Sequence, residues 1–267
     1  MREPVRILSD LHLGHPASRL GSAADLRALL EGAGTVVFNG DTWQELSSQF
    51  RPRSEALLGE LRETCAGLGV EPRFLSGNHD PGWPGKGWVE LAGGRVVVTH
   101  GDAVLWGGSP WSREAFERSE QVRALWEAHR EAECDAGERL KLAREMAILL
   151  KAPSIPGGRS LGRRVLDALS PPRRALEILR VWAFLADEAG RFAARYFPDA
   201  EVLVIGHFHR AGVWRRDGRI VINTGAFVAP HHARWVEWRE GMLSSGRIVE
   251  ERGGFRRDAA EVLWRWR

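Results

Sequence analysis

The sequence has little that could cross-link it or anchor it in a membrane. Its 267 residues include only two cysteines, Cys65 and Cys134, so no disulfide framework is implied and a reducing compartment fits. No apolar run approaches the roughly 20 residues that span a bilayer. The start, MREPVRILSD, carries charges among a few apolar residues, which does not match a signal peptide. We therefore expect a soluble, cytoplasmic protein.

An excess of one charge is also missing. Lys and Arg number 38 against 35 Asp and Glu, which gives a net charge of +3. Such a balance neither demands nor excludes an anionic partner. There is no extended Lys/Arg tract of the kind that would follow a nucleic-acid backbone, and the 12 tryptophans fit core packing better than base stacking. A nucleic-acid partner is therefore not expected, and the sequence leaves the oligomeric state open.

What the sequence does contain is a repeated arrangement of short apolar runs that end in Gly, Asp, Asn or His. Five runs are expected to be strands: 5–8, 35–38, 73–75, 95–98 and 202–205. Between the first three, residues 22–30 and 54–68 carry apolar residues at helical spacing, with Ser22 as a plausible N-cap. Alternating strands and helices predict an α/β arrangement.

The second half of the chain adds antiparallel strands and a helical insertion. Residues 213–222 contain Asp217-Gly218 between two strand-like runs and predict a β-hairpin. A further pair is expected from 233–239 and 246–251. Residues 111–198 are helical by pattern and are interpreted as an inserted cap. We predict one domain over 1–267, a mixed α/β two-sheet sandwich flanked by helices, with this cap inserted.

The five strand-ends carry side chains that suit a metal site. In open α/β sheets, ligands bind beyond the carboxyl ends of the strands. If the chain stays extended there, Asp10 and His12 point to one side, as do His207 and His209. Carboxylates, imidazoles and one amide oxygen, without a thiolate, favour divalent ions over a structural zinc site. The candidate ligands are Asp10, His12, Asp41, Asn78, His100, His207 and His209, which are enough for two ions about 3.5–4 Å apart.

Each of these residues also has an ordinary structural explanation. Asp10 and Asp41 could cap a following helix, and Asn78 could be a turn residue. A single histidine after a strand is usually a surface or core residue. These explanations weaken jointly because the same chemistry follows five strands and uses five of the nine histidines. We therefore interpret the set as metal ligands.

Taken in order, the motifs resemble those of the calcineurin-like metallophosphoesterase superfamily. The resemblance spans residues 5–225 and rests on Asp10-Leu-His12, Gly40-Asp41, Gly77-Asn78-His79-Asp80, His100-Gly-Asp102 and Gly206-His207-Phe-His209. It implies a two-sheet sandwich and two divalent ions, manganese first, with iron or zinc as alternatives. It also implies that one ion is held by Asp10, His12, Asp41 and His209, and the other by Asp41 as a bridge, Asn78, His100 and His207.

The same resemblance gives His79 the role of the acid that protonates the leaving oxygen. Many phosphatases of the superfamily carry an Asp three residues after the bridging Asp, where it supports that histidine. Here Gln44 stands at that position, so the usual His–Asp dyad is absent from the pattern.

Within the superfamily, the sequence is most similar to the UDP-2,3-diacylglucosamine pyrophosphohydrolases of the lipid A pathway. It shares the opening Ser-Asp-Leu-His-Leu and a long helical insertion before Gly-His-x-His, but has His79 where that subfamily usually has Arg, and Gln44 where it usually has Glu. The resemblance implies an acylated nucleotide-sugar substrate and peripheral contact with the inner membrane face. Cap arginines would then bind its phosphates: Arg163, Arg164, Arg173 and Arg174.

Three functions follow from these observations. The leading hypothesis is a two-metal phosphoester or pyrophosphate hydrolase acting on a phosphorylated small molecule or nucleotide sugar. A phosphodiesterase or nuclease with the same metal centre is the first alternative. The second is a scaffold that has kept the fold without catalysis, which missing ligands would favour. No ligand of the pattern is missing from the sequence.

Overall fold

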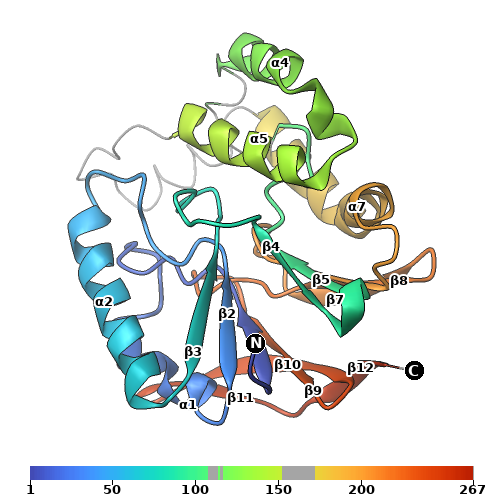
Figure 1. Ribbon diagram of the computed structural model, residues 1–267. Coiled ribbons are helices and arrows are strands. Elements are labelled where there is room, and N and C mark those ends of the chain that lie inside the picture. Colours follow the sequence, from blue (N-terminus) through green and yellow to red (C-terminus); the bar gives the residue numbers. More distant parts are fainter. Residues whose placement is uncertain (108–113, 115–116, 152–171, 267) are drawn as a thin grey trace.

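The computed structural model describes residues 1–107, 114, 117–151 and 172–266 (Figure 1). Within this part of the chain, the first of two sheets has seven strands in the order β11-β10-β9-β1-β2-β3, with β12 also paired to β10. Strands β1, β2 and β3 are parallel, and the remaining pairs are antiparallel. The strands are β1 Val5–Leu8, β2 Thr35–Asn39, β3 Glu71–Leu75, β9 Arg234–Arg239, β10 Met242–Glu251, β11 Gly254–Arg257 and β12 Glu261–Arg265.

The second sheet has five strands in the order β4-β5-β6-β8-β7 over the described residues. Its central strands β5, β6 and β8 are parallel. Its strands are β4 Trp88–Leu91, β5 Val96–Thr99, β6 Val202–Ile205, β7 Gly212–Arg216 and β8 Arg219–Asn223. Strands β7 and β8 form the predicted hairpin, and both of its turn residues, Asp217 and Gly218, have the positive φ (47° and 78°) that a type I′ turn requires.

Alternation along the strands builds the layers of the fold. Val5 and Ile7 of β1 point into the space between the sheets, where they meet residues of the second sheet such as Val98 and Val204. Leu8, the next residue in β1, points outward into the core beneath α2. Leu203 of β6 packs in the opposite outer core against α7. The result is a sandwich of two sheets with helices on both outer faces.

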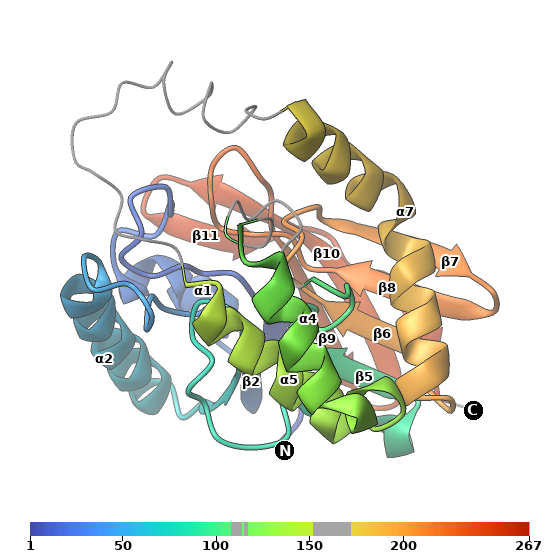
Figure 2. The same cartoon turned by 90° about the horizontal axis from the view of Figure 1, so that it is seen from above.

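Helices cover the two faces unequally. The first sheet is covered by η1 Ala23–Leu26, α1 Arg27–Leu30 and α2 Arg51–Gly67. The second is covered mainly by α7 Pro172–Tyr196 and α5 Ala136–Leu149, and α4 Ser119–Ala128 with η3 Arg130–Glu133 lies beyond α5 (Figures 1 and 2). A short η2, Ala92–Gly94, joins β4 to β5. The helices α4, α5 and α7 all come from the predicted insertion, so the insertion covers the second sheet.

These observations confirm the predicted fold class, a mixed α/β sandwich of two sheets flanked by helices. The described part of 111–198 is largely helical, as expected, but whether it acts as a cap remains a prediction. Among the described residues, no helix is both long enough and apolar enough to cross a bilayer. Ser22 does precede η1, and its backbone N–H donates to Asp25 at 2.9 Å.

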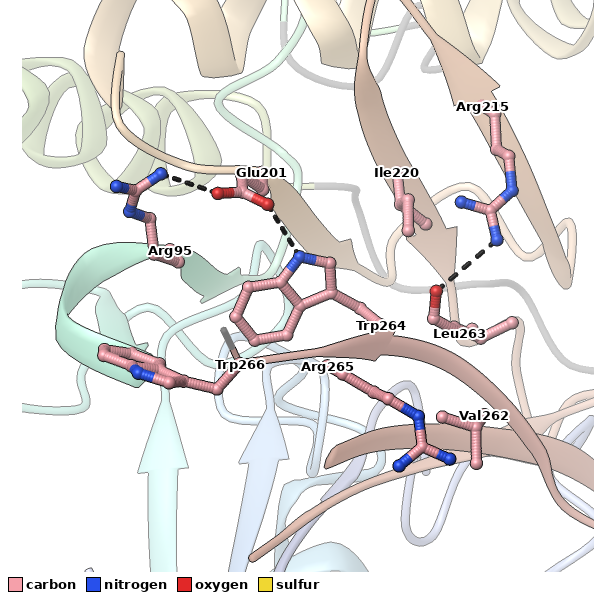
Figure 3. A pocket seen from close by; sticks show the side chains of 9 residues that line it. All are labelled: Arg95, Glu201, Arg215, Ile220, Val262, Leu263, Trp264, Arg265 and Trp266. Atoms are coloured by element: carbon pink, nitrogen blue, oxygen red, sulfur yellow. Dashed lines mark hydrogen bonds and ion pairs between the residues drawn. The ribbon is translucent and has the colours of Figure 1, made fainter. Parts of the chain in front are cut away.

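A pocket of about 650 Å³ lies where β12 meets the second sheet (Figure 3). Its lining residues Arg95 and Glu201 stand just before β5 and β6, so the pocket is at the amino ends of those strands. Arg95 pairs with Glu201 at 2.6 Å, and the Trp264 Nε1–H donates to Glu201 at 2.8 Å. No residue of the five strand-end motifs lines this pocket.

Candidate metal centre

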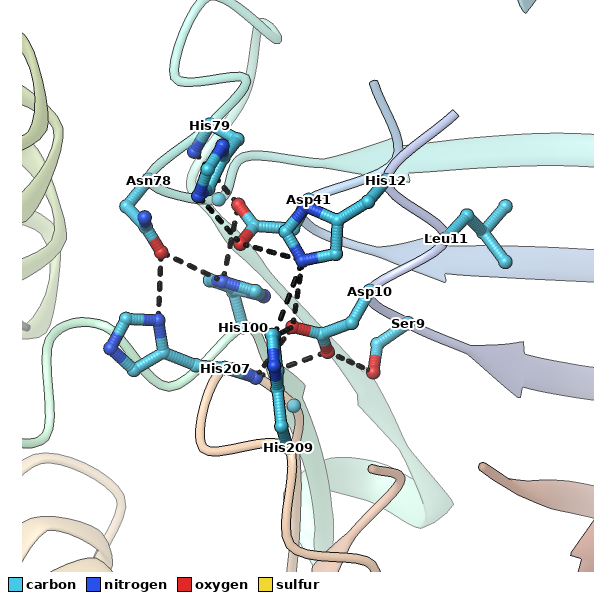
Figure 4. A network of polar contacts seen from close by, with 12 residues as sticks. Ser9, Asp10, Leu11, His12, Asp41, Asn78, His79, His100, His207 and His209 are labelled. Atoms are coloured by element: carbon cyan, nitrogen blue, oxygen red, sulfur yellow. Dashed lines mark hydrogen bonds and ion pairs between the residues drawn. The ribbon is translucent and has the colours of Figure 1, made fainter. Parts of the chain in front are cut away.

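The five motifs meet in one place, at the carboxyl ends of strands from both sheets (Figure 4). Residues that follow β1, β2 and β3 come from the first sheet, and residues that follow β5 and β6 come from the second. Hydrogen bonds join the strand-ends and loops across the sandwich, among them those from Asn39 Nδ2 to the Thr99 carbonyl at 2.8 Å and from the His207 N–H to Asp10 Oδ1 at 3.1 Å. The parallel order of these strands brings all seven predicted ligands to one edge.

One group of potential ligands is formed by Asp10, His12 and His209, whose ligand atoms all lie within 4.8 Å of one another. The Nε2 atoms of His12 and His209 are 3.2 Å apart, and His209 Nε2 is 3.2 Å from Asp10 Oδ1. Asp41 Oδ2 lies 3.7 Å from His12 Nε2. Two ring nitrogens and two carboxylates therefore converge on one small volume, which fits a divalent ion.

A second group consists of Asp41, His100 and His207, and its ligand atoms also lie within 4.8 Å of one another. His100 Nε2 is 3.4 Å from Asp41 Oδ1. Asn78 Oδ1 lies 2.7 Å from His207 Nδ1 and 3.4 Å from His100 Nε2. Asp41 thus has one oxygen toward each group, the arrangement that a bridging carboxylate needs.

The backbone at these residues differs from the expectation. An extended chain was assumed to carry Asp10 with His12, and His207 with His209, to one side. That geometry is wrong, because the residues have left-handed φ values: Asp10 53°, His12 47°, Asp41 49°, His207 63° and His209 54°. His207 and His209 consequently reach different groups, whereas Asp10 and His12 share one. Aspartate and histidine tolerate this left-handed conformation better than most residues. A pattern of apolar and polar residues does not reveal it, because the pattern reports burial and not φ.

Electrostatics at the centre favour the ligand forms of His12, His207 and Asp41, whereas His100 favours its cation while no metal ion is bound. Burial, reinforced by neighbouring histidines, lowers the pKa of His12 and of His207 well below the usual value, so both rings are neutral, which is the form that binds a metal ion. Burial opposes ionisation of Asp41, but His100 and the other histidines hold the pKa of this carboxyl well below its ordinary value. Burial likewise opposes the His100 cation, yet Asp41 raises the pKa of His100 well above normal. The buried, ionised Asp41 therefore stabilises a positive charge next to it, whether on His100 or on a bound cation.

Supporting contacts orient the ligands. The His100 Nδ1–H donates to the Asn39 carbonyl at 2.9 Å, which leaves Nε2 directed at Asp41. Asp80, which is fully buried, accepts N–H groups from Asp41 at 2.8 Å and from Gly77 at 3.0 Å, and so ties the loop after β2 to the loop after β3. The motif containing Asp80 was recognised in the sequence, but this bracing role was not.

Two motif glycines are required by close approach to the ligands. A Cβ on Gly206 would lie 2.2 Å from Asp10 Oδ2, and one on Gly77 would lie 2.4 Å from Asp41 Oδ1. Separations below 3.0 Å force the neighbouring atoms to move. Glycine is therefore needed at both positions to keep the carboxylates in place.

His79 lies beside the two groups and forms a third potential ligand group with His12 and Asp41, whose ligand atoms also lie within 4.8 Å of one another. Its side chain is 40% exposed. Its Nε2 is 4.0 Å from Asp41 Oδ2, and its Nδ1 is 3.0 Å from Gln44 Oε1. Gln44 in turn places its Nε2 3.0 Å from His12 Nδ1. The glutamine noted as a departure from the family pattern therefore contacts both histidines, which sequence reasoning did not anticipate.

Other predicted and unpredicted residues lie around this centre. Arg163 and Arg164 fall outside the described residues, and Arg173 and Arg174 lie at the start of α7. His231 was not predicted, but its ring centroid is 5.2 Å from that of His209. Burial lowers the pKa of His231 to about 4, so this ring is also neutral. No predicted strand-end motif contains His231, so its position near the centre could not be inferred from the pattern.

Comparisons with known proteins give distant structural likenesses only. No model of a known protein family matches the sequence, and no curated protein matches it. A dimetal phosphatase from Danio rerio has a TM-score of 0.46 and 13% identity, with 98% of this chain and 100% of that chain covered. Vps29 from Chaetomium thermophilum has a TM-score of 0.46 and 12% identity, covering 98% and 99% of the two chains. A protein from Streptococcus pneumoniae described as a predicted phosphoesterase has a TM-score of 0.39 and 14% identity, covering 99% of both. Because these likenesses are distant, the function has to be inferred from the geometry of this chain.

Proposed function

We propose that this protein is a dinuclear-metal-dependent phosphoester hydrolase of the calcineurin-like metallophosphoesterase type. One observation carries the proposal: two groups of ligand atoms, Asp10/His12/His209 and Asp41/His100/His207, lie side by side, with an oxygen of Asp41 toward each. The donor set of imidazoles, carboxylates and the Asn78 amide oxygen suits manganese, iron or zinc.

In this proposal the residues divide between two ions. Asp10, His12 and His209 hold the first with Asp41, and His100, His207 and Asn78 hold the second with Asp41. Two such ions, when bound, polarise a phosphoryl oxygen and make hydroxide available near neutral pH. The protein's own contribution is to keep the His12 and His207 rings neutral, to bury the carboxylate of Asp41 and to direct the ligand atoms inward.

His79 is proposed to assist the leaving group. Its side chain is 40% exposed, more than the 25% of His209, and its Nε2 lies 4.0 Å from Asp41 Oδ2. Its backbone N–H donates to Asp41 Oδ1 at 2.8 Å, which fixes the loop after β3. A proton on Nε2 can reach an oxygen of a substrate lying over the two groups.

For the substrate, we propose a phosphorylated small molecule, in particular the pyrophosphate of an acylated nucleotide sugar. The support is the position of α7. The Trp182 Nε1–H donates to the Phe208 carbonyl at 3.2 Å, between the two site histidines, and the half of α7 before it exposes Leu176 and Leu179 at 65% and 61%. Exposed apolar side chains on the same helix suit an acyl chain, and arginines in the sequence at the start of α7 suit phosphates. The same features suit peripheral contact with an anionic membrane.

A phosphodiesterase or nuclease with the same centre is the alternative within this class, and it differs only in substrate. A non-catalytic scaffold is the alternative from another class. The assembled ligand set argues against the scaffold, since a scaffold needs neither seven ligands nor their supporting contacts.

The proposal is tested by activity and metal content together. Purified protein is incubated with Mn²⁺ and with a phosphomonoester, a phosphodiester, a nucleotide sugar and an acylated nucleotide sugar, and the products are identified. Asp41→Ala is expected to lose more than about 100-fold in metal affinity and activity, because even outer contacts to ligands are worth 10–100-fold. The exposed Asp199→Ala is the matched control and keeps both. Wild-type metal content and turnover in Asp41→Ala would refute the two-metal centre.

The substrate assignment needs its own variants. Reversing Arg173 and Arg174 to Glu is expected to spare a small phosphodiester and to cripple cleavage of the acylated nucleotide sugar. Arg191→Glu, near the other end of the same helix, is the control for the added negative charge. Parallel loss on both substrates, or no cleavage of the acylated one by the intact protein, would exclude this role.

A further inference from the structure

Gln44 occupies the space between two histidines with different tasks. Its amide nitrogen is 3.0 Å from His12 Nδ1 and its amide oxygen is 3.0 Å from His79 Nδ1. The two rings meet edge to face with their centroids 4.7 Å apart, and Gln44 is only 2% exposed. Both rings therefore place Nδ1 against the same buried amide, which can donate to one ring and accept from the other.

The backbone of Gln44 is held independently of its side chain. Its N–H donates to Ser54 Oγ at 2.8 Å, and its carbonyl accepts the Ser47 N–H at 3.3 Å. Ser54 belongs to α2 and is itself fully buried. The side-chain amide can therefore make a half-turn, which exchanges its nitrogen and oxygen, without moving the loop.

The proton count sets the orientation of this amide once a cation is held. His12 faces the ligand groups through Nε2. If that nitrogen gives its lone pair to a cation, a neutral ring must carry its proton on Nδ1. An Nδ1–H requires an acceptor, so the amide oxygen of Gln44 must face His12. The amide nitrogen then faces His79 and donates to its Nδ1.

We propose, building on the proposed metal centre, that Gln44 is a positioning residue that couples cation binding at His12 to the proton position on His79. With His12 Nε2 engaged, the amide turns its N–H toward His79 Nδ1, and the His79 proton resides on Nε2. This nitrogen lies 4.0 Å from Asp41 Oδ2. His79 thereby presents an Nε2–H donor at the centre only when the first group is loaded.

A carboxylate at position 44 cannot do this. Carboxylate oxygens only accept hydrogen bonds, so both neighbouring rings would hold protons on Nδ1. Gln44 differs because its two ends have opposite hydrogen-bonding character. The departure from the Asp or Glu of related patterns thus changes which His79 nitrogen carries the proton.

The experiment reads proton positions rather than turnover. Protein labelled with ¹⁵N at histidine is examined by long-range ¹H–¹⁵N NMR with and without Zn²⁺, and Zn²⁺ affinity is measured by calorimetry. The variants are Gln44→Glu and Gln44→Met, with the exposed Gln49→Glu as the matched control. The His79 signals are assigned from their loss in His79→Ala.

In the wild type and in Gln49→Glu, Zn²⁺ is expected to give a His79 proton on Nε2 and a bare Nδ1. Gln44→Glu is expected to bind Zn²⁺ yet place a proton on His79 Nδ1. Gln44→Met, which offers no acceptor to His12, is expected to bind Zn²⁺ about 10–100-fold more weakly. If zinc-loaded wild type carries the His79 proton on Nδ1, or if Gln44→Met binds as tightly as wild type, the coupling is overturned while the metal centre stands. If the wild type binds no divalent ion, the metal centre itself fails, and the coupling with it.

Discussion

Neighbouring residues at the centre face different partners. Asn78 Oδ1 is 2.7 Å from His207 Nδ1, inside the second ligand group, whereas His79 Nδ1 is 3.0 Å from Gln44. One side chain therefore contacts a proposed ligand, and the next contacts Gln44. A substitution at position 79 can consequently separate leaving-group chemistry from ion binding.

His79→Ala is expected to lower turnover and leave the bound metal nearly unchanged. General acid assistance is worth about 10²–10⁴-fold, so the loss should be large for an alkyl phosphoester and small for an activated aryl ester, whose leaving group needs no proton. Turnover of both substrates and metal content per chain provide the measurement. Equal losses for the two leaving groups would contradict the donor role.

The two cysteines should differ sharply in reactivity. Cys65 is fully buried in α2, and burial raises the pKa of its thiol to about 11, whereas Cys134 is exposed. Because the thiolate is the reactive form, Cys134 should react with a disulfide reagent in the folded protein at pH 8 and Cys65 should react only after unfolding. The number of reactive thiols per chain is measured from the thiolate that the reagent releases, before and after denaturant is added. Two rapidly reacting thiols in the folded protein would show that α2 opens readily.

At the scale of elements, the junctions between strands and loops do more than end the strands. Gly206 follows β6 directly, and its N–H donates to the His100 carbonyl at 2.7 Å. Its missing Cβ leaves room for Asp10 from the other sheet. The junction therefore sets how closely the two sheets' loops approach, and a single methyl group can be used to probe it.

Gly206→Ala and Gly59→Ala should act in opposite directions. The added Cβ at 206 would meet Asp10 Oδ2 at 2.2 Å, so we expect about 1–3 kcal/mol of destabilisation and weaker metal binding. Gly59 lies inside α2 with nothing within 4 Å of the added Cβ, and alanine there should stabilise the protein by about 0.5–1 kcal/mol. Denaturant unfolding and metal titration of both variants test this pair. If Gly206→Ala changed neither the free energy of unfolding nor metal binding, the loops would be able to move apart without an energetic cost.

Elements with strong local patterns could be predicted from the sequence, and weakly patterned ones could not. Strands 5–8 and 202–205 match the structure in full because their residues are buried on both faces and read as continuous apolar runs. Strands β4, β11 and β12 were missed, since each is short and mixes charged with aromatic residues, and their pairing depends on distant strands. The residues that converge at the candidate metal centre could be named from the strand-ends. Their left-handed backbone and the contacts of Gln44 could not, because both are set by tertiary packing.

For the whole molecule, the centre lies where the two sheets meet. Asp10, Asp41 and Asn78 follow strands of the first sheet, and His100 and His207 follow strands of the second. Bound ions would therefore connect the two halves of the sandwich. Unfolding must break that connection, so ion binding should stabilise the fold as a whole.

Removing divalent ions is expected to lower the melting temperature. At a concentration 100 times the Kd, binding one ion adds about 2.7 kcal/mol, which corresponds to roughly 5–10 °C for a chain of this size. Thermal unfolding with Mn²⁺ and with a chelator measures the difference, and Asp41→Ala serves as the variant that should not respond. An equal shift in that variant would place the stabilising ions elsewhere.

The left-handed backbone at the proposed ligands concentrates strain in one place. Five of the seven proposed ligand residues have positive φ, a conformation that costs non-glycine residues about 1–2 kcal/mol each. Glycine would relieve this cost at every one of them but would remove the carboxylate or imidazole that could bind an ion. The least relaxed backbone of the described chain therefore coincides with its richest cluster of possible metal ligands.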